Sequence, residues 1–381
     1  MSNWHPCACT AVPYSAEGEG VKLMSSSELP ITFEDFRTHI LQQAIFLRDD
    51  LDAENLDVSY PAASFSLPPE EFRDRQQAFS KFTATNEARL FTTYAMLEDD
   101  RSKSLFLALI LFRLLGHTYV RLPSNDAVHR KALEQERQME ALPSTLDHLP
   151  GGGGLKHFRL QLEDEIISLD CLPINIRFSF FLRQYFFAQS DVLVAPQPGD
   201  HVIDAGGCFG DTAVNFSRSV GQLGVVHTFE PLDTHLQVLH HNVTQNHCEN
   251  IRIHAFGLGN VNRRGETSSG PIDPGHVPDV TVALRSLDSL VEEGIVERVD
   301  FIKVDVEGNE LSVLQGAQMS ILRFMPRMAI SVYHNFDDYL NIPDYINYNF
   351  PGYRFFLDNH TISDAETVLY CLPSYRRQIF R

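Results

Sequence analysis

A glycine-rich turn near the middle of the chain is the first stretch that could do chemistry. The sequence VIDAGGCFGDT, which starts at Val202, places three glycines after a short apolar run that ends in Asp204. Such a run suits a parallel strand buried on both faces, and the glycines let a ligand approach the backbone at the end of that strand. A tight strand-to-helix turn without a ligand is the alternative, because glycine-rich turns are common.

Glu230 favours the interpretation of the glycine turn as a ligand site. It lies 20 residues after Gly210, at the end of the next predicted strand, where an acidic side chain accepts hydrogen bonds from ribose hydroxyls. The sequence does not match the dinucleotide-binding pattern G-x-G-x-x-G. Counted from Gly206, the third position of that pattern requires glycine, and Cys208 stands there. Asp204 would also repel a pyrophosphate, whereas it could pair with the ammonium group of a methionine. The pattern therefore favours S-adenosylmethionine as the cofactor.

The predicted cofactor-binding residues come from the turn, from the ends of neighbouring strands and from the segment before the first strand. A parallel sheet would bring these positions to one edge. They are Tyr185, Asp204, Ala205, Gly206, Gly207, Thr212, Glu230, Pro231, Ala255, Phe256 and Asp305.

A second group of acidic residues follows a later apolar stretch. In KVDVEGNE, which starts at Lys303, alternation along a strand puts Asp305 and Glu307 on the same side. Glu310 is more simply interpreted as a cap at the positive end of the next helix. Asp305 and Glu307 could also bind a divalent metal ion. The sequence supplies no further ligand, so we predict no metal site.

His334 is the histidine best placed for catalysis. It directly follows the predicted strand from Met328 to Tyr333, so it should emerge at the same edge as Asp305. Imidazole titrates near neutral pH and could accept the proton of a hydroxyl group as a methyl group is transferred. A lone histidine is more often structural. The predicted catalytic residues are His334 as the base, with Asp305 and Glu307 beside it.

Strands and helices alternate through the carboxyl-terminal half, which predicts an α/β fold with a doubly wound sheet. The seven predicted strands are 202–204, 225–230, 251–255, 301–305, 328–333, 353–357 and 367–372. About ten residues join the last two strands, too few for a crossover helix, so these strands should form an antiparallel hairpin. Asp358 and His360, between these two strands, are secondary candidates for lining the site.

The amino-terminal half has a different pattern. Apolar residues recur at helical spacing from Phe33 onward, and LFLALILFRLLG from Leu105 predicts a buried helix that ends at Gly116. The run of glycines from Pro150 to Gly154 is the best candidate for a linker. We therefore expect an all-helical domain at residues 1–150, which caps the site or forms a homodimer, and a cofactor-binding domain at residues 151–381.

Composition disfavours several classes of protein. The formal net charge is -19, which argues against general binding to nucleic acid or a polybasic attachment to a membrane surface. Six cysteines without a CxxC pair indicate neither a disulfide framework nor a zinc site. The first thirty residues lack a secretory pattern. We expect a cytoplasmic protein that binds a small molecule, without nucleic-acid or membrane partners.

Several ordered motifs resemble those of the FkbM-type S-adenosylmethionine-dependent methyltransferases. They run from Arg183 to Leu372 and include RQYFF, PGDHVIDAGGCFGDTA, HTFEP, VDFIKVDVEGNELSVLQGA, MAISVYHNFDD and ETVLYCLP. The resemblance implies a class I methyltransferase fold, Rossmann-like, with seven strands and an antiparallel last strand. It also implies methyl transfer to a hydroxyl group, often on a natural product or a sugar, as in secondary metabolism. The acceptor stays open, because family members differ most there.

Within this resemblance, two sets of residues match family motifs. The cofactor motif contains Asp204, Gly206 and Glu230, and the motifs that border the acceptor contain Asp305, Glu307 and His334. Two other functions remain open. A nicotinamide-dependent oxidoreductase could use the same sheet, but the broken fingerprint and the lack of a Tyr-x-x-x-Lys group disfavour it. A catalytically inactive nucleoside-binding adaptor is the third reading, against which the three acceptor-site residues argue.

Overall fold

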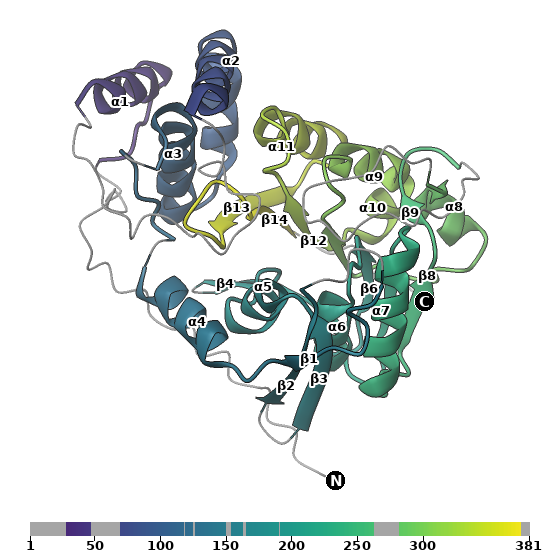
Figure 1. Ribbon diagram of the computed structural model, residues 1–381. Helices are drawn as coiled ribbons and strands as arrows, with labels where there is room; N and C mark the ends of the chain where they lie inside the picture. The colour runs from purple at the N-terminus through teal and green to yellow at the C-terminus, as the bar shows by residue number, and fades with distance from the viewer. Residues whose placement is uncertain are drawn as a thin grey trace.

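A seven-stranded sheet forms the centre of the molecule (Figure 1). The computed structural model describes residues 28–46, 69–117, 119–124, 126–149, 154–162, 165–189, 191–262 and 282–374. All seven predicted strands are confirmed, with ends that differ by one or two residues. They are β6 (His201–Ala205), β7 (Val225–Phe229), β8 (Ile251–His254), β11 (Phe301–Val304), β12 (Arg327–Ser331), β13 (Tyr353–Asn359) and β14 (Thr367–Pro373).

The order of the strands is β13-β14-β12-β11-β6-β7-β8. Strands β8, β7, β6, β11 and β12 pair in parallel, while β14 runs antiparallel to both of its neighbours, β12 and β13. The predicted antiparallel hairpin at the end of the chain is therefore confirmed. The connections change direction between β6 and β11, and the crevice outside the strand ends at such a point is where open α/β sheets bind ligands.

Residues along each strand alternate between two hydrophobic cores, one on each face of the sheet. Val202 and Val368 belong to one core, whereas their neighbours Ile203 and Leu369 belong to the other. Because both faces are covered, these strands are almost continuously apolar. The first core includes residues of α6 (Asp211–Val220), α7 (Asp233–Gln245), β2 (Lys156–Leu162) and β3 (Glu165–Cys171). The second includes residues of α8 (Leu287–Glu292), α9 (Glu310–Gly316), α10 (Gln318–Phe324) and α11 (Asp338–Asn349).

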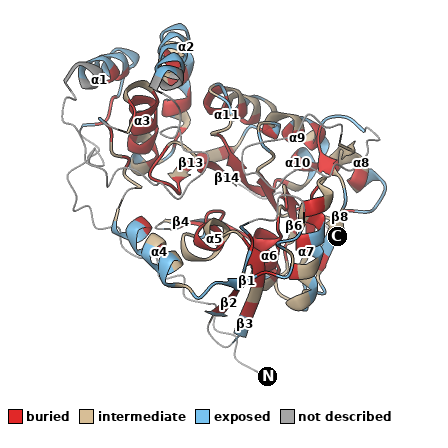
Figure 2. Ribbon diagram, in the orientation of Figure 1, coloured by how far each residue is buried: buried red, intermediate tan, exposed pale blue. Residues whose placement is uncertain are grey.

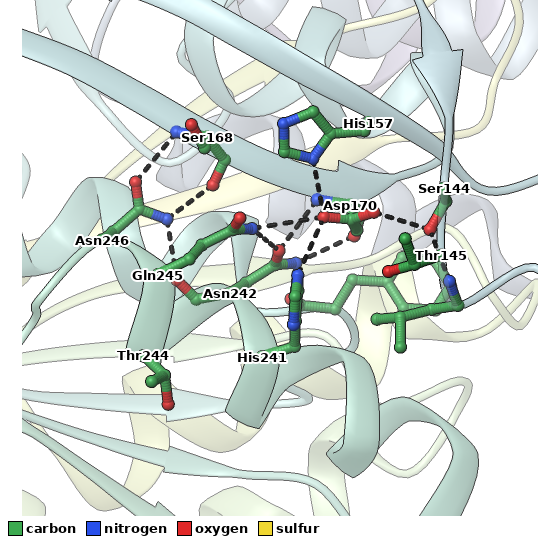
Figure 3. A network of polar contacts seen from close by, with 12 residues as sticks. Ser144, Thr145, His157, Ser168, Asp170, His241, Asn242, Thr244, Gln245 and Asn246 are labelled. Atoms are coloured by element: carbon green, nitrogen blue, oxygen red, sulfur yellow. Dashed lines mark hydrogen bonds and ion pairs between the residues drawn. The ribbon is translucent and has the colours of Figure 1, made fainter.

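A polar network ties the hairpin of β2 and β3 to α7 (Figure 3). Asp170 of β3 is buried and accepts a hydrogen bond from the Ser144 hydroxyl at 2.6 Å. Its other carboxylate oxygen lies 2.9 Å from Nδ1 of His157 and 3.2 Å from Nε2 of His241. Asn242 accepts from the backbone N–H of Asp170 and donates to its carbonyl oxygen, both at 2.8 Å. The hairpin is thereby fixed to the helix beside the sheet.

The amino-terminal region is largely helical. Its helices are α1 (Phe33–Phe46), α2 (Pro69–Met96), α3 (Asp100–Leu115) and α4 (Ala127–Gln138). The prediction that α3 is buried and ends at Gly116 is confirmed, and Figure 2 shows α3 as mostly buried. A short strand, β1 (Leu142–Pro143), pairs with β2. The expectation of an all-helical region before residue 150 is therefore wrong at this strand, because β1 extends the edge of the hairpin.

Helices α2 and α3 share a core with the sheet. Phe106 of α3 belongs to the same hydrophobic cluster as Val332 and Leu369. Leu97, just after α2, forms a parallel bridge with Phe355 of β13. The helices therefore cover the end of the sheet formed by β13 and β14 (Figure 1). The predicted boundary stays a prediction, because residues 150–153 lie outside the described residues.

Smaller elements complete the described structure. They are α5 (Pro173–Ile176), the π-helical turn η3 (Arg177–Phe181), the pair β4 (Phe187–Gln189) and β5 (Val192–Val194), and the pair β9 (Gly257–Leu258) and β10 (Leu284–Arg285). Within the described ranges, no helix combines the length and the apolar character needed to cross a membrane.

Candidate active site

The carboxyl ends of β6, β7 and β11 meet where the connections change direction. Gly206 turns the chain there with a φ of 84°, and its N–H donates to the carbonyl oxygen of Phe229 at 3.0 Å. On the other side, the N–H of Asp305 donates to the carbonyl oxygen of Ala205 at 3.1 Å. The structure therefore brings the predicted turn, Glu230 and Asp305 to one edge of the sheet.

The glycines of this turn are required by the packing of the protein itself. A Cβ atom on Gly206 would lie 1.9 Å from the carbonyl oxygen of Asp305, and one on Gly207 would lie 2.2 Å from Oγ1 of Thr228. Both distances are far shorter than real Cβ contacts. We expected these glycines to make room for a ligand. Their first effect is to let the turn pack against β7 and against the segment after β11.

Asp204 is completely buried, and its partners belong to the protein. Nζ of Lys303 lies 3.3 Å away, and the hydroxyls of Thr228 and Thr212 donate to the carboxylate at 2.9 and 3.2 Å. Strand register explains this contact, because Asp204 stands beside Lys303 on β11 and beside Thr228 on β7. The expectation that Asp204 pairs with the ammonium group of a ligand is corrected, since its charge is matched inside the sheet.

Lys303 is a functional candidate that the sequence reasoning missed. Its ammonium group is buried, and it donates to the carbonyl oxygens of Ala205 at 3.1 Å and Gly206 at 2.5 Å. Burial lowers the pKa of Lys303, but the charges of Asp204, Asp305 and Asp211, together with the hydrogen bond to Asp204, outweigh burial and raise it. The charged lysine therefore holds the glycine turn in shape. A lysine inside an apolar strand was a visible signal that a buried acid must accompany it.

Glu230 is held firmly at the end of β7. One carboxylate oxygen accepts from the N–H of Cys208 at 2.9 Å, and the other accepts from the N–H of Leu232 at 2.9 Å. Nδ1 of His235 lies 3.5 Å from the second oxygen. Each carboxylate oxygen has two lone pairs, so both retain capacity for a ribose hydroxyl. Glu230 lies next to the glycine turn, as its spacing from Gly210 predicts.

The remaining predicted cofactor residues fall into an accessible group and a buried group. Ala255 is exposed, and Pro231 and Phe256 are half-buried, so all three border the edge after β7 and β8. Ala205 and Thr212 are buried. The accessible residues Ala255, Pro231 and Phe256 can therefore contact a ligand. The buried residues Ala205 and Thr212 instead pack beneath the glycine turn.

Tyr185 is buried against Asp305 and Lys303. Its hydroxyl donates to Oδ2 of Asp305 at 2.8 Å, and Nζ of Lys303 lies 5.3 Å from the centre of its ring. Burial raises the pKa of Tyr185 well above its ordinary value, so the hydroxyl stays protonated as a donor. Tyr185 therefore orients Asp305, whereas we predicted direct contact with the cofactor.

The structure brings Asp305, Glu307 and His334 together as predicted, and Glu310 joins them. Nε2 of His334 lies 3.6 Å from Oδ1 of Asp305 and 3.5 Å from Oε2 of Glu307. Nδ1 lies 3.0 Å from Oε1 of Glu310. The side chain of Glu310 is completely buried, while that of Glu307 is 49% exposed. The cluster thus has an enclosed side and a side that opens to solvent.

The acids around His334 bear on its predicted role as a base. Burial lowers the pKa of His334, but the contact with Glu310 and the charges of Asp305 and Glu307 outweigh it and raise the pKa to about 10. The ring is then protonated at neutral pH, and a protonated imidazole cannot accept a proton. This arrangement disfavours His334 as a general base, and its catalytic role stays a prediction.

The backbone of Glu307 has a positive φ angle. Its φ is 53°, in the left-handed region that disfavours residues other than glycine, and Gly308 follows with a φ of 91°. Strained residues of this kind gather at functional sites. Desolvation and the charge of Asp305 raise the pKa of Glu307 to about 7. Its half-exposed carboxyl group faces the open side of the cluster.

Arg113 connects the amino-terminal helices to this edge. Its guanidinium donates to the carbonyl oxygen of Tyr333 at 3.0 Å, forms an ion pair with Asp364 at 2.9 Å and lies 4.5 Å from the ring centre of Tyr339. Tyr333 directly precedes His334, so α3 fixes the backbone that carries the histidine. An arginine in an apolar helix was visible in the sequence, but its partners were not.

The secondary candidates Asp358 and His360 support the fold. Asp358 accepts two hydrogen bonds from Arg101 of α3, at 2.8 and 3.0 Å. His360 is buried, and its Nε2 lies 2.9 Å from the hydroxyl of Tyr370. Burial lowers the pKa of His360 to about 4. Both residues are engaged inside the protein, so we assign neither to the site.

Comparison with known proteins identifies a family. The model described as Methyltransferase FkbM domain matches residues 204–355. Methyltransferase 1 of Beauveria bassiana (strain ARSEF 2860) is 26% identical over 165 residues, which cover 36% of this chain and 66% of that protein. The structure of Methyltransferase FkbM from Methylobacillus flagellatus KT is 22% identical, with a TM-score of 0.48, and the match covers 77% of this chain and 60% of that one. A SAM dependent methyltransferase from Aquifex aeolicus is 15% identical, with a TM-score of 0.28, over 47% of this chain and 84% of that one.

The family match contains the residues that meet at the sheet edge. Residues 204–355 include the glycine turn, Glu230 and the cluster around His334. The chain spans 66% of the length of the curated relative, so the match describes a domain and leaves the rest of that protein unmatched. Residues 204–355 of the chain thus match an FkbM methyltransferase domain.

Proposed function

We propose that this chain is an S-adenosylmethionine-dependent O-methyltransferase that acts on a hydroxyl group of a small molecule, a natural product or a sugar. The observation that carries the proposal is the position of the β6 turn between Glu230 and Asp305. A nucleoside with its ribose on Glu230 would direct its sulfonium group across Gly206 toward Asp305 and His334. The match of residues 204–355 to a methyltransferase domain supports a cofactor site at this edge of the sheet.

The reaction needs alignment and a place for one proton. A lone pair of the acceptor oxygen forms a bond to the methyl carbon while the carbon–sulfur bond breaks, and its electrons stay on sulfur, which gives S-adenosylhomocysteine. The hydroxyl proton leaves during or just after this attack. We propose Glu307 as its acceptor, because this carboxylate is half exposed at the open side of the cluster. Asp305 and His334 orient the acceptor oxygen.

The charge around the site favours a neutral or cationic acceptor. Asp305, Glu307 and Glu310 surround a single imidazole, and the chain as a whole carries a net charge of -19. An anionic acceptor would be repelled. The same excess of acidic residues supports a small-molecule partner in the cytoplasm rather than a nucleic acid or a membrane surface. A homodimer through the amino-terminal helices stays a prediction, which light scattering of the full-length chain would test.

Calorimetric titration of the full-length chain tests the cofactor. S-adenosylmethionine and S-adenosylhomocysteine should bind, and NAD should not. Replacing Glu230 by alanine should weaken S-adenosylmethionine binding by ~1–3 kcal/mol, because a charged acceptor of the ribose hydroxyls is lost. Glu293→Ala, which removes a surface ion-pair partner of Arg285, is the matched control and should leave the affinity unchanged. Binding of NAD alone would instead favour the oxidoreductase, and equal affinity of Glu230→Ala and the wild type would remove the basis of the proposal.

A further inference from the structure

The polar atoms around His334 converge without completing a network. Within the described residues, Oδ1 of Asp305, Oε2 of Glu310 and Nε2 of His334 are buried and have no hydrogen-bond partner, while Nδ1 of His334 lies 3.0 Å from Oε1 of Glu310. Glu310 is completely buried, so water does not reach its carboxylate from outside. A buried polar atom left unpaired costs ~1–3 kcal/mol. Three such atoms in one cluster indicate that a further group completes it.

Both buried carboxylates are nevertheless fixed through their other oxygen. The Tyr185 hydroxyl donates to Oδ2 of Asp305 at 2.8 Å. Oε1 of Glu310 accepts from the backbone N–H of Val306 at 2.9 Å and of Gly308 at 3.2 Å. Asp305 is thus oriented through Oδ2, and its Oδ1 lies beside His334. Glu310 is oriented through Oε1, which also lies 3.0 Å from Nδ1 of His334, and its buried Oε2 has no partner among the described residues. Outer hydrogen bonds of this kind are how proteins orient metal ligands.

The distances come close to those between the ligands of one ion. One ligand atom each from Asp305, Glu310 and His334 lies within 4.8 Å of the other two. Oδ1 of Asp305 and Nε2 of His334 are 3.6 Å apart. Ligand atoms bound at ~2.0–2.2 Å to a shared cation stand roughly 3–4 Å from one another. The three side chains therefore need little movement to share an ion.

A network of ion pairs around a protonated His334 is the competing explanation. Such a network would align each ring N–H with a carboxylate oxygen at hydrogen-bond distance. Nδ1 meets this condition with Glu310 at 3.0 Å, but Nε2 lies 3.6 Å from Asp305 and 3.5 Å from Glu307, beyond that distance from both. In the Asp170 network, by contrast, one buried acid meets two histidines, a serine and a glutamine at 2.6 to 3.3 Å.

We propose that Asp305, Glu310 and His334 bind one divalent metal ion, with Glu307 beside it on the open side. Two carboxylate oxygens and one imidazole nitrogen suit Mn²⁺ or Zn²⁺. The chemical role of the ion, though not the site itself, rests on the proposed function. An ion here would bind the acceptor oxygen and lower the pKa of its hydroxyl, so that the proton passes more readily to Glu307.

Mn²⁺ alone is the probe for this site. The full-length chain is treated with a chelator, exchanged into chelator-free buffer and titrated with Mn²⁺ while electron paramagnetic resonance reports the free ion. We expect one Mn²⁺ per chain. Asp305→Asn and Glu310→Gln should each raise the dissociation constant at least ~10-fold, because each removes a charged ligand while keeping its size. Circular dichroism checks that both variants are folded.

His241→Gln is the matched control, because His241 lies in the Asp170 network and should not affect Mn²⁺ binding. Absence of Mn²⁺ binding to the wild-type chain, or wild-type affinity in both Asp305→Asn and Glu310→Gln, would overturn the metal site. Calorimetry with S-adenosylmethionine in metal-free buffer separates the two proposals. Cofactor binding without Mn²⁺ binding removes the metal site alone, and Mn²⁺ binding without cofactor binding removes the proposed function alone.

Discussion

Two clusters in this molecule combine buried acids with histidine, and they differ in how fully their atoms are paired. In the first, Asp170 contacts Ser144, His157, His241 and Gln245, at 2.6 to 3.3 Å (Figure 3). In the second, His334 stands among Asp305, Glu307 and Glu310 at 3.0 to 3.6 Å. Among the described residues, Oδ1 of Asp305, Oε2 of Glu310 and Nε2 of His334 are buried there without a hydrogen-bond partner. The first cluster joins two elements of the fold, and the second lies at the carboxyl edge of the sheet.

The degree of hydrogen-bond pairing distinguishes a cluster that stabilises the fold from a cluster that binds a ligand. A network whose donors and acceptors are all matched stabilises the elements that it joins. A buried cluster with unmatched atoms costs stability, and such a cost is commonly found where a ligand binds. We therefore expect substitutions in the Asp170 network to change stability, and substitutions around His334 to change binding.

The largest loss of stability should come from the turn beside the second cluster. In Gly206→Ala the new Cβ meets the carbonyl oxygen of Asp305, and the residue must keep a φ of 84°. We expect a loss of ~3–5 kcal/mol in the free energy of unfolding, or an insoluble protein. Gly221→Ala is the control, because its φ is also positive, at 65°, while nothing lies within 4 Å of the new Cβ. Equal stability of the two variants would show that the packing at Gly206 is loose.

Asp170→Ala should cause the next largest loss. The substitution removes a buried acceptor shared by Ser144, His157 and His241, so we expect the free energy of unfolding to fall by ~3 kcal/mol. Urea denaturation followed by circular dichroism measures it. The affinity for S-adenosylmethionine should not change. A stable Asp170→Ala protein that has lost cofactor binding would reverse our assignment of the two clusters.

The stability contributed by Asp170 should also depend on pH. Burial raises the pKa of Asp170, but hydrogen bonds from Ser144 and His157 outweigh burial and hold the pKa below its ordinary value of 3.8. An acid with a lowered pKa in the folded state stabilises the fold above its ordinary pKa, and this contribution is lost as the pH falls through the folded value. His157 and His241 also face Asp170. The difference in stability between the wild type and Asp170→Asn should shrink below about pH 4, and a difference that grows there would contradict the assignment.

Asp305→Asn should have the smallest effect on stability. Asparagine can still accept the hydrogen bond from Tyr185. The substitution removes the attraction of Asp305 to Lys303 and His334, and relief of the repulsion from Glu307 offsets part of that loss. We expect the free energy of unfolding to stay within ~1 kcal/mol of the wild type. Parallel urea titrations of Asp305→Asn and Asp170→Asn make the comparison direct. A larger loss in Asp305→Asn than in Asp170→Asn would mean that the second cluster is structural.

The sequence was sufficient to predict the sheet and the meeting of its functional ends. Short apolar runs predicted all seven strands, and parallel strands necessarily carry the residues that follow them to one edge. The convergence of Asp305, Glu307 and His334 follows from this rule alone. The last hairpin was predictable because its connection is too short for a crossover.

Other features depend on register and on contacts between distant segments. The pairing of Lys303 with Asp204 requires the exact alignment of β11 against β6, which periodicity does not provide. Arg113 contacts the carbonyl oxygen of Tyr333, 220 residues later in the chain. The protonation of His334 depends on Glu310, which looked like an ordinary helix cap. Each of these is a side-chain contact that becomes visible only when the packing of the elements is known.

A crystal structure of the full-length chain with S-adenosylhomocysteine and Mn²⁺ would show whether methyl transfer takes place at this sheet edge. We expect the ribose hydroxyls to lie on Glu230 and the sulfur atom to lie beside Gly206 on the side of Asp305, with density for one ion among Asp305, Glu310 and His334. The product bound elsewhere, or bound here with its sulfur directed away from Asp305, would contradict the claim that this sheet edge is the site of methyl transfer.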